Sequence, residues 1–265
     1  MFTLKNITLS IRHKKLLEID ALSFKKGAFT ALIGPNGAGK TTLLNLLAGD
    51  LHPTTGTIFL ETQALDQYSV ESLSVKRSVL PQTEHIPFSI KARAILLMGV
   101  MPHAVAYNHP KVTACLQNLS QILALDALLD EPYQTLSGGE QHRVQIGRVL
   151  MQALFSLEES PLLSERIMLL DEPFNHLDLF HQQKLLRYFK QLTSQGLTII
   201  CVMHDLNHAL QIADSLVLLK KGVLQGQFSP EELWRSHRLQ DLFEVDFLRL
   251  TDPLDPQFST LAFRV

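Results

Sequence analysis

Apolar and polar residues follow two different periods along this chain, and together they predict an α/β fold. In Phe2–Ser10 and Leu16–Phe24 apolar and polar positions alternate, as in strands buried on one face, and the basic turn Arg12–Lys15 separates the two segments. Uninterrupted apolar runs are typical of parallel strands buried on both faces. Such runs, and shorter apolar segments that predict further strands, occur at Phe29–Ile33, Thr57–Leu60, Ser78–Leu80, Ile167–Leu170, Leu197–Val202 and Leu216–Leu219.

The middle third of the chain has a helical pattern instead. Within Lys91–Leu129, Pro110 suits a first helical position. Apolar residues recur there at helical spacing and predict a core-facing stripe of Val112, Leu116, Leu119 and Leu123. Other helices are predicted over about Lys40–Gly49, after Ser137, and after the capping residue Ser229. The chain is therefore predicted to be α/β, with an all-helical insertion between roughly residues 88 and 145.

Length and hydropathy restrict the class of protein. The 265 residues suit one main core with a smaller subdomain. The mean hydropathy of +0.09 is high for a soluble protein. However, the most apolar stretch, Ala94–Tyr107, is shorter than the roughly 18 residues that cross a bilayer. The alternating N-terminus predicts a strand and not a secretory signal. We expect a soluble, cytoplasmic protein whose excess apolar surface meets a protein partner.

Charge and cysteine content exclude two further classes. A net charge of −2 and an isoelectric point near 6.6 give no basic surface for nucleic acid. Cys115 and Cys201 lie far apart in the sequence, inside apolar segments. We expect small buried thiols in a reducing compartment and no disulfide.

The strongest chemical motif is a phosphate-binding loop. Gly34–Thr41, with the sequence GPNGAGKT between an apolar strand and a helix, fits the pattern G-x-x-x-x-G-K-[ST]. Glycines let backbone N–H groups turn toward phosphate oxygens, and the helix N-terminus adds partial positive charge. Lys40 is predicted to reach the β- and γ-phosphates, and the Thr41 hydroxyl to ligate Mg²⁺. A chain of this length matches the pattern by chance about once in a hundred sequences. The predicted nucleotide-binding residues here are Gly34, Pro35, Asn36, Gly37, Ala38, Gly39, Lys40, Thr41 and Thr42.

A buried strand that ends in two carboxylates is the second landmark. Asp171 and Glu172 directly follow the apolar run Ile167–Leu170. Asp171 is predicted to hold Mg²⁺ through its water shell. Glu172 is predicted to polarise the attacking water, a role that contributes about 10²–10⁴-fold to a rate. A lone Asp-Glu pair is more often a solvated corner, but in a chain with a phosphate loop it predicts nucleotide hydrolysis.

A third motif separates this chain from other nucleotide enzymes. The sequence Leu136-Ser-Gly-Gly-Glu-Gln141 stands directly before an amphipathic helix. A serine and two glycines at a helix N-terminus form a second anion-binding site in the same chain. Because one nucleotide needs one phosphate cradle, the second cradle is predicted to close on the nucleotide held by another copy.

Together these motifs resemble the ATP-binding cassette (ABC) subunits of membrane transporters, over residues 1 to about 235. In that family, the residues matched here by Ser137, Gly138 and Gly139 complete the ATP site of the opposite subunit. The resemblance implies further roles for three residues. Gln82 matches a glutamine that senses Mg²⁺ and signals to the membrane partner. His204 matches a histidine that contacts the γ-phosphate, and Asp178 an aspartate of the loop that joins the two subunits.

The resemblance also implies the domain organisation. We expect one ABC ATPase domain, a phosphate-loop NTPase core with an antiparallel β subdomain and an inserted helical subdomain. The RecA-like core and β subdomain are expected in about residues 1–87 and 146–235, the helical signature subdomain in about 88–145, and a C-terminal extension in about 236–265. In that extension, Leu242–Leu250 and Phe258–Val265 suit either two closing strands or a regulatory tail.

The chain departs from the family in two places. The family often places an adenine-stacking aromatic near residue 11 or 12, where this chain has Ile11-Arg12-His13. The planar guanidinium of Arg12 is the predicted substitute. The joining loop reads Phe174-Asn-His-Leu-Asp178 and not the commoner Thr-Ser-Ala-Leu-Asp. That form also resembles the soluble translation-factor branch of the family.

Four segments favour one branch of importers. Met98–His103 resembles the M-G-R-x-P-H segment of importers for iron-siderophores, haem and cobalamin. The long stretch Gln152–Arg166 is typical of haem-importer ATPases and, in shorter form, of the cobalamin importer. Leu177–Gln183 and Met203–Asn207 are similar to the haem-importer subunit in sequence and position. The resemblance implies haem (hemin) as the cargo, with cobalamin or a ferric siderophore as alternatives, because Asp205–His208 also resembles the cobalamin ATPase.

Other functions fit the sequence less well. A GTPase needs an N-K-x-D motif, which is absent. His204 and His208 have a metal-site spacing, but the glutamate of the H-E-x-x-H zinc pattern is missing. Soluble cassettes that act on ribosomes or DNA carry two cassettes in one chain, a long coiled coil or zinc-binding cysteines, and this chain has none of them.

The resemblance implies a working cycle and its partners. Two copies bind ATP and Mg²⁺, close head-to-tail, and reopen when hydrolysis removes the γ-phosphate. Closure pulls on a dimeric integral membrane permease docked near Gln82, which receives its cargo from a periplasmic binding protein. The homodimer is therefore expected at the cytoplasmic face of the inner membrane, as a peripheral protein that does not bind nucleic acid.

Overall fold

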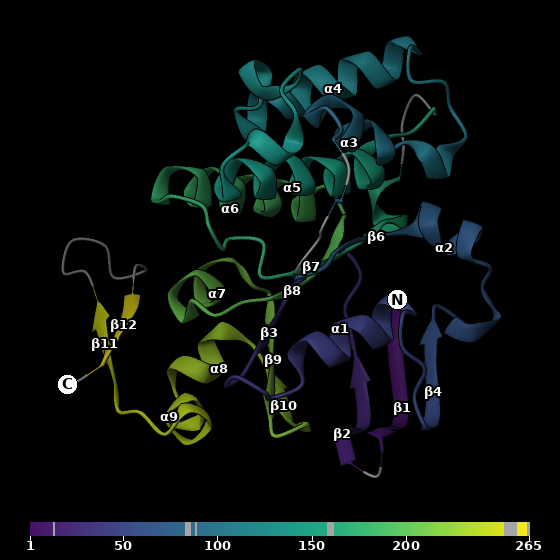
Figure 1. The fold of residues 1–265 in the computed structure, drawn as a ribbon. Coiled ribbons are helices and arrows are strands. Elements are labelled where there is room, and N and C mark those ends of the chain that lie inside the picture. Colours follow the sequence, from purple (N-terminus) through teal and green to yellow (C-terminus); the bar gives the residue numbers. More distant parts are fainter. Residues whose placement is uncertain (13, 83–85, 88, 158–161, 252–258, 264–265) are drawn as a thin grey trace. The chain divides into compact units, whose positions relative to one another are not determined.

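The computed structural model describes residues 1–12, 14–82, 86–87, 89–157, 162–251 and 259–263 (Figure 1). The chain divides into two compact units. The first comprises Met1–Lys25, Phe29–Leu65 and Val202–Val265, and the second Lys26–Ala28 and Asp66–Cys201. Predictions that fall on His13, residues 158–161, residue 258 or residues 264–265 lie outside the described residues.

The first unit is built on a mixed sheet with the strand order β5-β4-β1-β2-β10-β9-β3. Neighbouring strands run antiparallel except in the pairs β2/β10 and β3/β9, which are parallel. The strands of this sheet are β1 (Phe2–Ile11), β2 (Lys14–Ser23), β3 (Phe29–Ile33), β4 (Thr55–Leu60), β5 (Gln63–Ala64), β9 (Ser215–Lys220) and β10 (Val223–Phe228). The first unit also contains β11 (Phe247–Thr251) and β12 (Ser259–Phe263), which form a separate two-stranded sheet. The α-helices of the first unit are α1 (Lys40–Ala48), α7 (Leu206–Ile212), α8 (Pro230–Trp234) and α9 (Arg238–Phe243).

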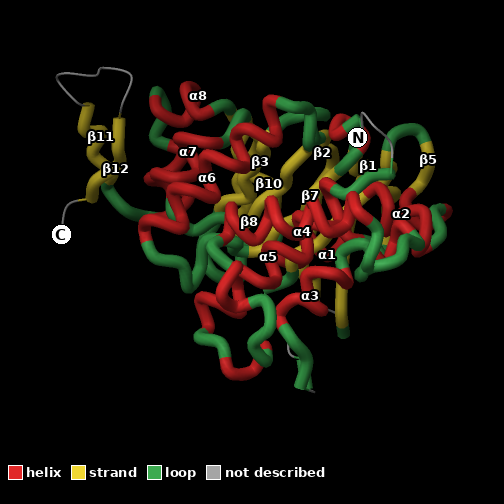
Figure 2. Tube along the Cα trace, turned by 90° about the horizontal axis from the view of Figure 1, so that it is seen from above, coloured by secondary structure: helices red, strands yellow, loops and turns green. Residues whose placement is uncertain are grey.

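The second unit combines the strand order β8-β7-β6 with a group of helices. Its elements are α2 (Val70–Lys76), β6 (Arg77–Leu80), α3 (Ala92–Met98), α4 (Pro110–Leu123), α5 (Gly138–Leu154), β7 (Ile167–Asp171), α6 (Leu179–Ser194) and most of β8 (Thr198–Val202). Helices α3, α4 and α5 pack on one another (Figure 2). The apolar stripe of α4 is buried in this packing, as its spacing predicts.

Several predicted strands and helix starts are confirmed, and the local sequence explains each of them. Strands β3, β7 and β8 are buried at every position, in accord with their uninterrupted apolar sequences. Pro110 is the first residue of α4, where the missing N–H costs no hydrogen bond. Ser137 and Ser229 each begin a helix through a capping box.

The helical segment Lys91–Leu129 contains two α-helices, the second of which begins at the predicted position, Pro110. Helix α3 ends at Met98, and α4 begins only at Pro110. At Gly99 a Cβ atom would lie 2.3 Å from the carbonyl oxygen of Arg148, so this close approach to α5 admits only glycine. The close contact with α5 thus occurs at the residue that caps the C-terminus of α3. Helices α2 and α6 and strand β10 are additional elements that the sequence patterns left unassigned.

The C-terminal segment forms a helix and then a hairpin. The predicted strand Leu242–Leu250 is wrong at its start, because Leu242 and Phe243 are the last residues of α9. Glu244 caps this helix, with a φ of 59° in the left-handed region. Strands β11 and β12 then pair antiparallel with each other, in a two-stranded sheet of their own. The described part of this segment therefore contains two strands, and a regulatory role for it stays a prediction. The Asn207 side chain of α7 receives a hydrogen bond from the Leu261 amide (2.6 Å) and donates one to the Leu261 carbonyl (3.3 Å). This side chain joins the hairpin to α7.

Both cysteines lie in the second unit and carry free thiols. Burial raises the pKa of the half-buried Cys115 to about 11. Burial also raises the pKa of the fully buried Cys201, with further contributions from the charges of Asp171 and Glu172. In the described part of the chain, no helix combines the length and the apolar character that crossing a bilayer requires.

Candidate functional site

The phosphate loop connects β3 to α1 within the first unit. At Gly34 a Cβ atom would lie 2.2 Å from the carbonyl oxygen of Leu219, so only glycine fits beside β9. Gly39 caps α1 with a φ of 97°, a conformation that side chains disfavour. The tip of the loop, Asn36 and Gly37, is exposed, whereas Ala38 is buried. The loop thus brings its backbone to the N-terminus of α1, where N–H groups attract an anion.

Lys40 places its ammonium group inside this loop. Its side chain is almost fully buried, at 6% exposure, and Nζ donates to the carbonyl oxygens of Gly34 (2.8 Å) and Pro35 (3.1 Å). Thr41 and Thr42 follow in the first turn of α1 and are half-buried. The loop therefore holds one positive charge and two hydroxyl groups at a helix N-terminus.

Replacement of Lys40 by alanine is expected to weaken ATP binding about ten- to a hundredfold. The reason is the loss of charged hydrogen bonds, each worth about 1.5–3 kcal/mol. Isothermal titration calorimetry with ATP measures the change. Lys25→Ala, which removes an exposed lysine of the same unit, is the control and should bind ATP as the unmodified protein does. Equal affinity of both variants would contradict the role given to Lys40.

The carboxylates at the end of β7 belong to the second unit. Asp171 is the last residue of the strand and is buried, at 1% exposure. Glu172 follows with a φ of 53°, a left-handed conformation that is uncommon and costly for a residue other than glycine. The Gln82 amide donates to Glu172 Oε1 at 3.5 Å. The structure thus brings two of the predicted catalytic residues, Gln82 and Glu172, together.

Two side chains that the motifs did not single out contact Glu172 and the residue that follows it. Asn175 Nδ2 donates to Glu172 Oε2, and the His142 ring lies 2.9 Å, through Nε2, from the carbonyl oxygen of Pro173. Burial lowers the pKa of His142, with a smaller opposing effect from this hydrogen bond. Because a carbonyl oxygen only accepts, the ring donates to Pro173 through an Nε2–H group. In the sequence, the departure of the joining loop Phe174–Asp178 from the commoner form is the nearest signal, and it did not identify Asn175 or His142.

The signature segment begins α5 in the second unit. Ser137 Oγ accepts from the backbone N–H of Glu140 (3.4 Å), and Glu140 Oε2 accepts from the backbone N–H of Ser137 (2.8 Å). Hydrogen bonds from Ser137 also lower the pKa of the Glu140 carboxyl group. Gly138 is exposed, so the N-terminus of α5 is accessible to an anion.

The joining loop ends at the start of α6. Asp178 caps that helix by accepting from the backbone N–H of His181 at 2.9 Å. This backbone hydrogen bond, and a second one with the His181 ring, lower the pKa of Asp178. Asp178 is exposed, so its carboxylate lies on the surface at the N-terminus of α6.

The remaining predicted site residues lie in the first unit. His204 is exposed and stands between β8 and α7, which Asp205 caps by accepting from the backbone N–H of His208 at 3.0 Å. Arg12 is exposed in the turn between β1 and β2, with a φ of 47°. The His208 ring lies 3.6 Å from Asp205, and the described residues contain no cluster of three or more His, Cys, Asp or Glu side chains arranged for a metal.

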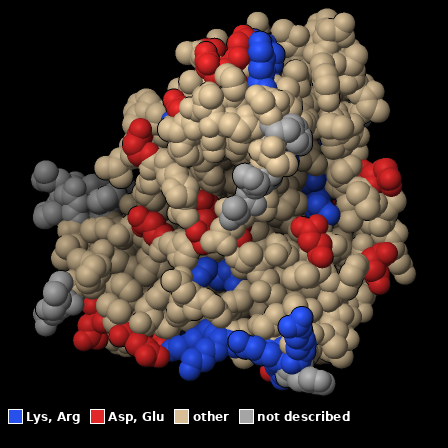
Figure 3. Space-filling model, viewed as in Figure 1, with Lys and Arg blue, Asp and Glu red and all other residues tan. Residues whose placement is uncertain are grey.

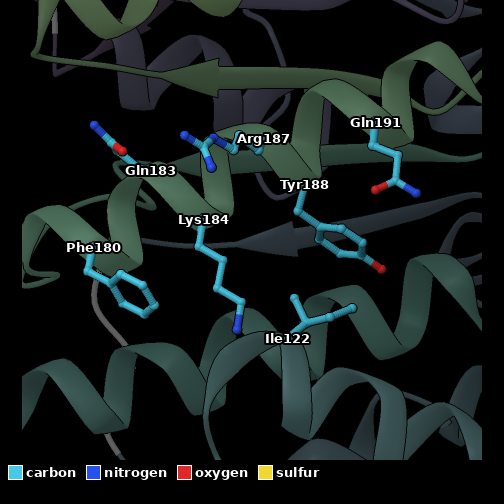
Figure 4. Close-up of a pocket in the computed structure, with 7 residues that line it drawn as sticks. All are labelled: Ile122, Phe180, Gln183, Lys184, Arg187, Tyr188 and Gln191. Carbon is cyan, nitrogen blue, oxygen red and sulfur yellow. The ribbon is translucent and has the colours of Figure 1, made fainter.

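A cavity of about 430 Å³ lies between α4 and α6. Figure 4 shows Phe180, Lys184 and Tyr188 of α6 directed toward Ile122 of α4. Lys184 Nζ donates to the Gln121 carbonyl oxygen at 3.0 Å, and burial raises the pKa of Tyr188 to about 12. None of the described residues that line this cavity is a predicted nucleotide ligand.

The predicted metal ligands have the chemistry that Mg²⁺ prefers. Thr41 offers a hydroxyl oxygen in the first unit, and Asp171 and Gln82 offer carboxylate and amide oxygens in the second. Such hard oxygen donors, few in number and supplemented by water, suit Mg²⁺ in nucleotide enzymes. The burial of the Asp171 carboxylate after an apolar strand gives it a fixed position for this task.

Comparisons with known proteins agree with the nucleotide chemistry. A family model described as ABC transporter matches residues 17–175. The chain is 36% identical to the hemin import ATP-binding protein HmuV of Escherichia coli O157:H7 over 257 residues, which is 96% of each protein. It is also 36% identical to the protein of the same name from Hahella chejuensis, over 92% of this chain and 93% of that one.

Solved structures have the same fold. The ATP-binding subunit of an ABC transporter superposes with a TM-score of 0.78 at 23% identity, over 92% of this chain and 98% of that one. The dimeric ATP-binding cassette MJ0796, in a post-hydrolysis state with ADP and phosphate, has a TM-score of 0.74 at 25% identity, over 87% and 99%. The predicted fold class, an α/β ABC ATPase, is confirmed. The chain belongs to the ABC transporter family, as an ATP-binding subunit whose ATP hydrolysis is coupled to transport.

Proposed function

We propose that this subunit supplies the energy for the import of haem. The observation that carries the proposal is the identity of 36% over nearly the whole chain to hemin import ATP-binding proteins. The sequences of Leu177–Gln183 and Met203–Asn207, which resemble those of haem-importer subunits, support the same cargo. Cobalamin and ferric siderophores are the alternatives, and a soluble role on ribosomes or DNA has no support among these relatives.

The proposed site combines residues with separate tasks. Backbone N–H groups of the loop Gly34–Thr42 and the Lys40 ammonium group bind the phosphates. Arg12 stacks on the adenine, and Glu172 accepts a proton from the attacking water. His204 contacts the γ-phosphate. Thr41, Asp171 and Gln82 hold Mg²⁺, which neutralises phosphate charge when it is bound.

The proposed working unit is a homodimer on a permease. Ser137, Gly138 and Gly139 of one copy cover the nucleotide of the other, and Asp178 lies in the loop between the copies. The proposal is supported by the dimeric state of the similar cassette MJ0796. Basic and acidic side chains both occur on the face shown in Figure 3, and most of that face carries neither. A partner that binds through apolar and polar contacts, such as a membrane permease, fits such a surface better than a nucleic acid does.

We further propose its place in the cell. The homodimer sits at the cytoplasmic face of the inner membrane and is attached through the permease, which receives haem from a periplasmic binding protein.

The cargo is tested in a complex of this chain with its permease in lipid vesicles. Haem-loaded binding protein is expected to raise the ATPase rate above the rate with the unloaded protein, because loading favours closure of the dimer. Binding proteins loaded with cobalamin or ferric siderophore are the controls. Stimulation by one of these and not by haem would overturn the assignment of the cargo.

A further inference from the structure

The loop that follows Glu172 is fastened to the signature helix of the same chain. His142 of α5 lies 2.9 Å, through Nε2, from the carbonyl oxygen of Pro173. At Gly139, a Cβ atom would lie 2.6 Å from the carbonyl oxygen of His176, so the first turn of α5 approaches this loop as closely as a glycine permits. The rings of His142 and His176 meet edge to face, with centroids 6.2 Å apart. These contacts all lie within the second unit.

The same loop holds the carboxylate of Glu172. Asn175 Nδ2 donates to Oε2, while Gln82 Nε2 donates to the other carboxylate oxygen, Oε1, at 3.5 Å. The Asn175 backbone N–H also donates to the Glu172 carbonyl oxygen, at 3.2 Å. Glu172 itself has a left-handed backbone, with a φ of 53°, and such a conformation persists only where neighbouring groups enforce it. The orientation of the carboxylate therefore depends on the loop.

We propose that His142 and Asn175 are positioning residues for Glu172. Asn175 orients the carboxylate directly, and His142 fixes the backbone from which Glu172 and Asn175 project. The inference rests on the proposed role of Glu172 as the base. It adds a link within one chain: α5, whose N-terminus serves the nucleotide of the second copy, is tied to the base that serves the chain's own nucleotide.

The link predicts a loss of rate with little change in nucleotide binding. His142→Leu introduces an apolar side chain of similar size and removes the donor, and Asn175→Ala removes the amide. Each is expected to lower kcat about ten- to a hundredfold, because a small misplacement of a catalytic group costs about this much. KM for ATP should stay within about twofold, since neither side chain belongs to the phosphate loop.

Conservative variants distinguish positioning from stability. His142→Gln retains an amide donor at a similar reach and is expected to restore most of the rate. Asn175→Asp keeps the shape but sets a second negative charge beside Glu172, and should be slower than Asn175→Ala. Asn175 is exposed, so its variants should fold normally.

Gln152→Leu is the matched control on the same helix. Its side chain also donates to backbone carbonyls, those of Ser74 (2.8 Å) and Arg77 (3.2 Å), away from Glu172. The control should lose stability to a similar extent as His142→Leu and retain its kcat. An equal loss of kcat in Gln152→Leu would overturn the inference, because the effect of His142→Leu would then be one of stability alone.

A second readout separates this inference from the proposed function. In a Glu172→Gln background, ATP-dependent dimer formation should be unchanged by His142→Leu and by Asn175→Ala, since both act through the Glu172 carboxylate. Reduced dimer formation would overturn the inference. Full turnover of Glu172→Gln alone would instead refute the base assignment. Loss of turnover in Glu172→Gln, together with unchanged kcat in His142→Leu and Asn175→Ala, would refute only the positioning role.

Discussion

Glu172→Gln is expected to lower kcat for ATP hydrolysis by about 10²–10⁴-fold while ATP binding is retained. The amide has the shape of the carboxylate but does not accept a proton from water, and a positioned base contributes a factor of this size. The phosphate loop is unchanged, so ATP still binds and the γ-phosphate persists. The variant should therefore accumulate as a closed dimer in ATP, which size-exclusion chromatography detects alongside a phosphate-release assay.

Two observations would contradict this assignment. Turnover at the unmodified rate would show that another group activates the water. A dimer that forms equally with ADP would show that closure does not depend on the γ-phosphate. Glu131→Gln, which neutralises an exposed glutamate in the same unit, is the control and should hydrolyse ATP normally.

Ser137→Arg is expected to abolish hydrolysis without weakening ATP binding to the monomer. The side chain stands at the N-terminus of α5, so arginine fills the space where the proposed dimer receives the other copy's γ-phosphate. The change also removes the hydroxyl of a capping box and costs about 1 kcal/mol of stability. Hydrolysis and the free energy of unfolding must therefore be measured together.

A second capping box in the chain provides a control for the loss of stability that Ser137→Arg causes. Ser229 begins α8 with the same capping box, formed with Glu232. Ser229→Arg should lose similar stability but keep its ATPase rate. Mixed dimers with one Ser137→Arg copy test the sharing of sites, because one of their two composite sites is damaged. Mixed dimers that hydrolyse ATP like the unmodified protein would refute the shared site.

The sequence predicts those parts of the site that depend on local chemistry. The glycines of the phosphate loop, the cap at Ser137 and the carboxylates after β7 each follow from a few neighbouring residues, and the structure places them at the ends of the expected elements. Pro110 is a similar case, since its ring fixes the first turn of α4 wherever the helix packs.

Contacts between distant residues could not be predicted in the same way. His142 and Pro173 are 31 positions apart, and nothing in either neighbourhood specifies their pairing. The break at Gly99 depends on how closely α3 approaches Arg148 of α5. The hairpin at the C-terminal end has an exposed face and little apolar alternation. Its contacts with the rest of the unit come from residues distant in the sequence, such as Asn207 with Leu261 and Arg249 with the Trp234 ring. Tertiary packing determines these features, so local patterns carry little signal for them.

The burial of the two native thiols makes both of them slow to react with labelling reagents. Burial raises the pKa of Cys115 to about 11, which disfavours its thiolate at neutral pH, and thiolates are the species that react with maleimides and oxidants. Cys201 is fully buried and has its pKa raised as well. A cysteine introduced at an exposed position, such as Asp178→Cys, would thus be labelled far faster than either native thiol. The unmodified chain can serve directly as the background for cross-linking or spectroscopic distance measurements between two copies.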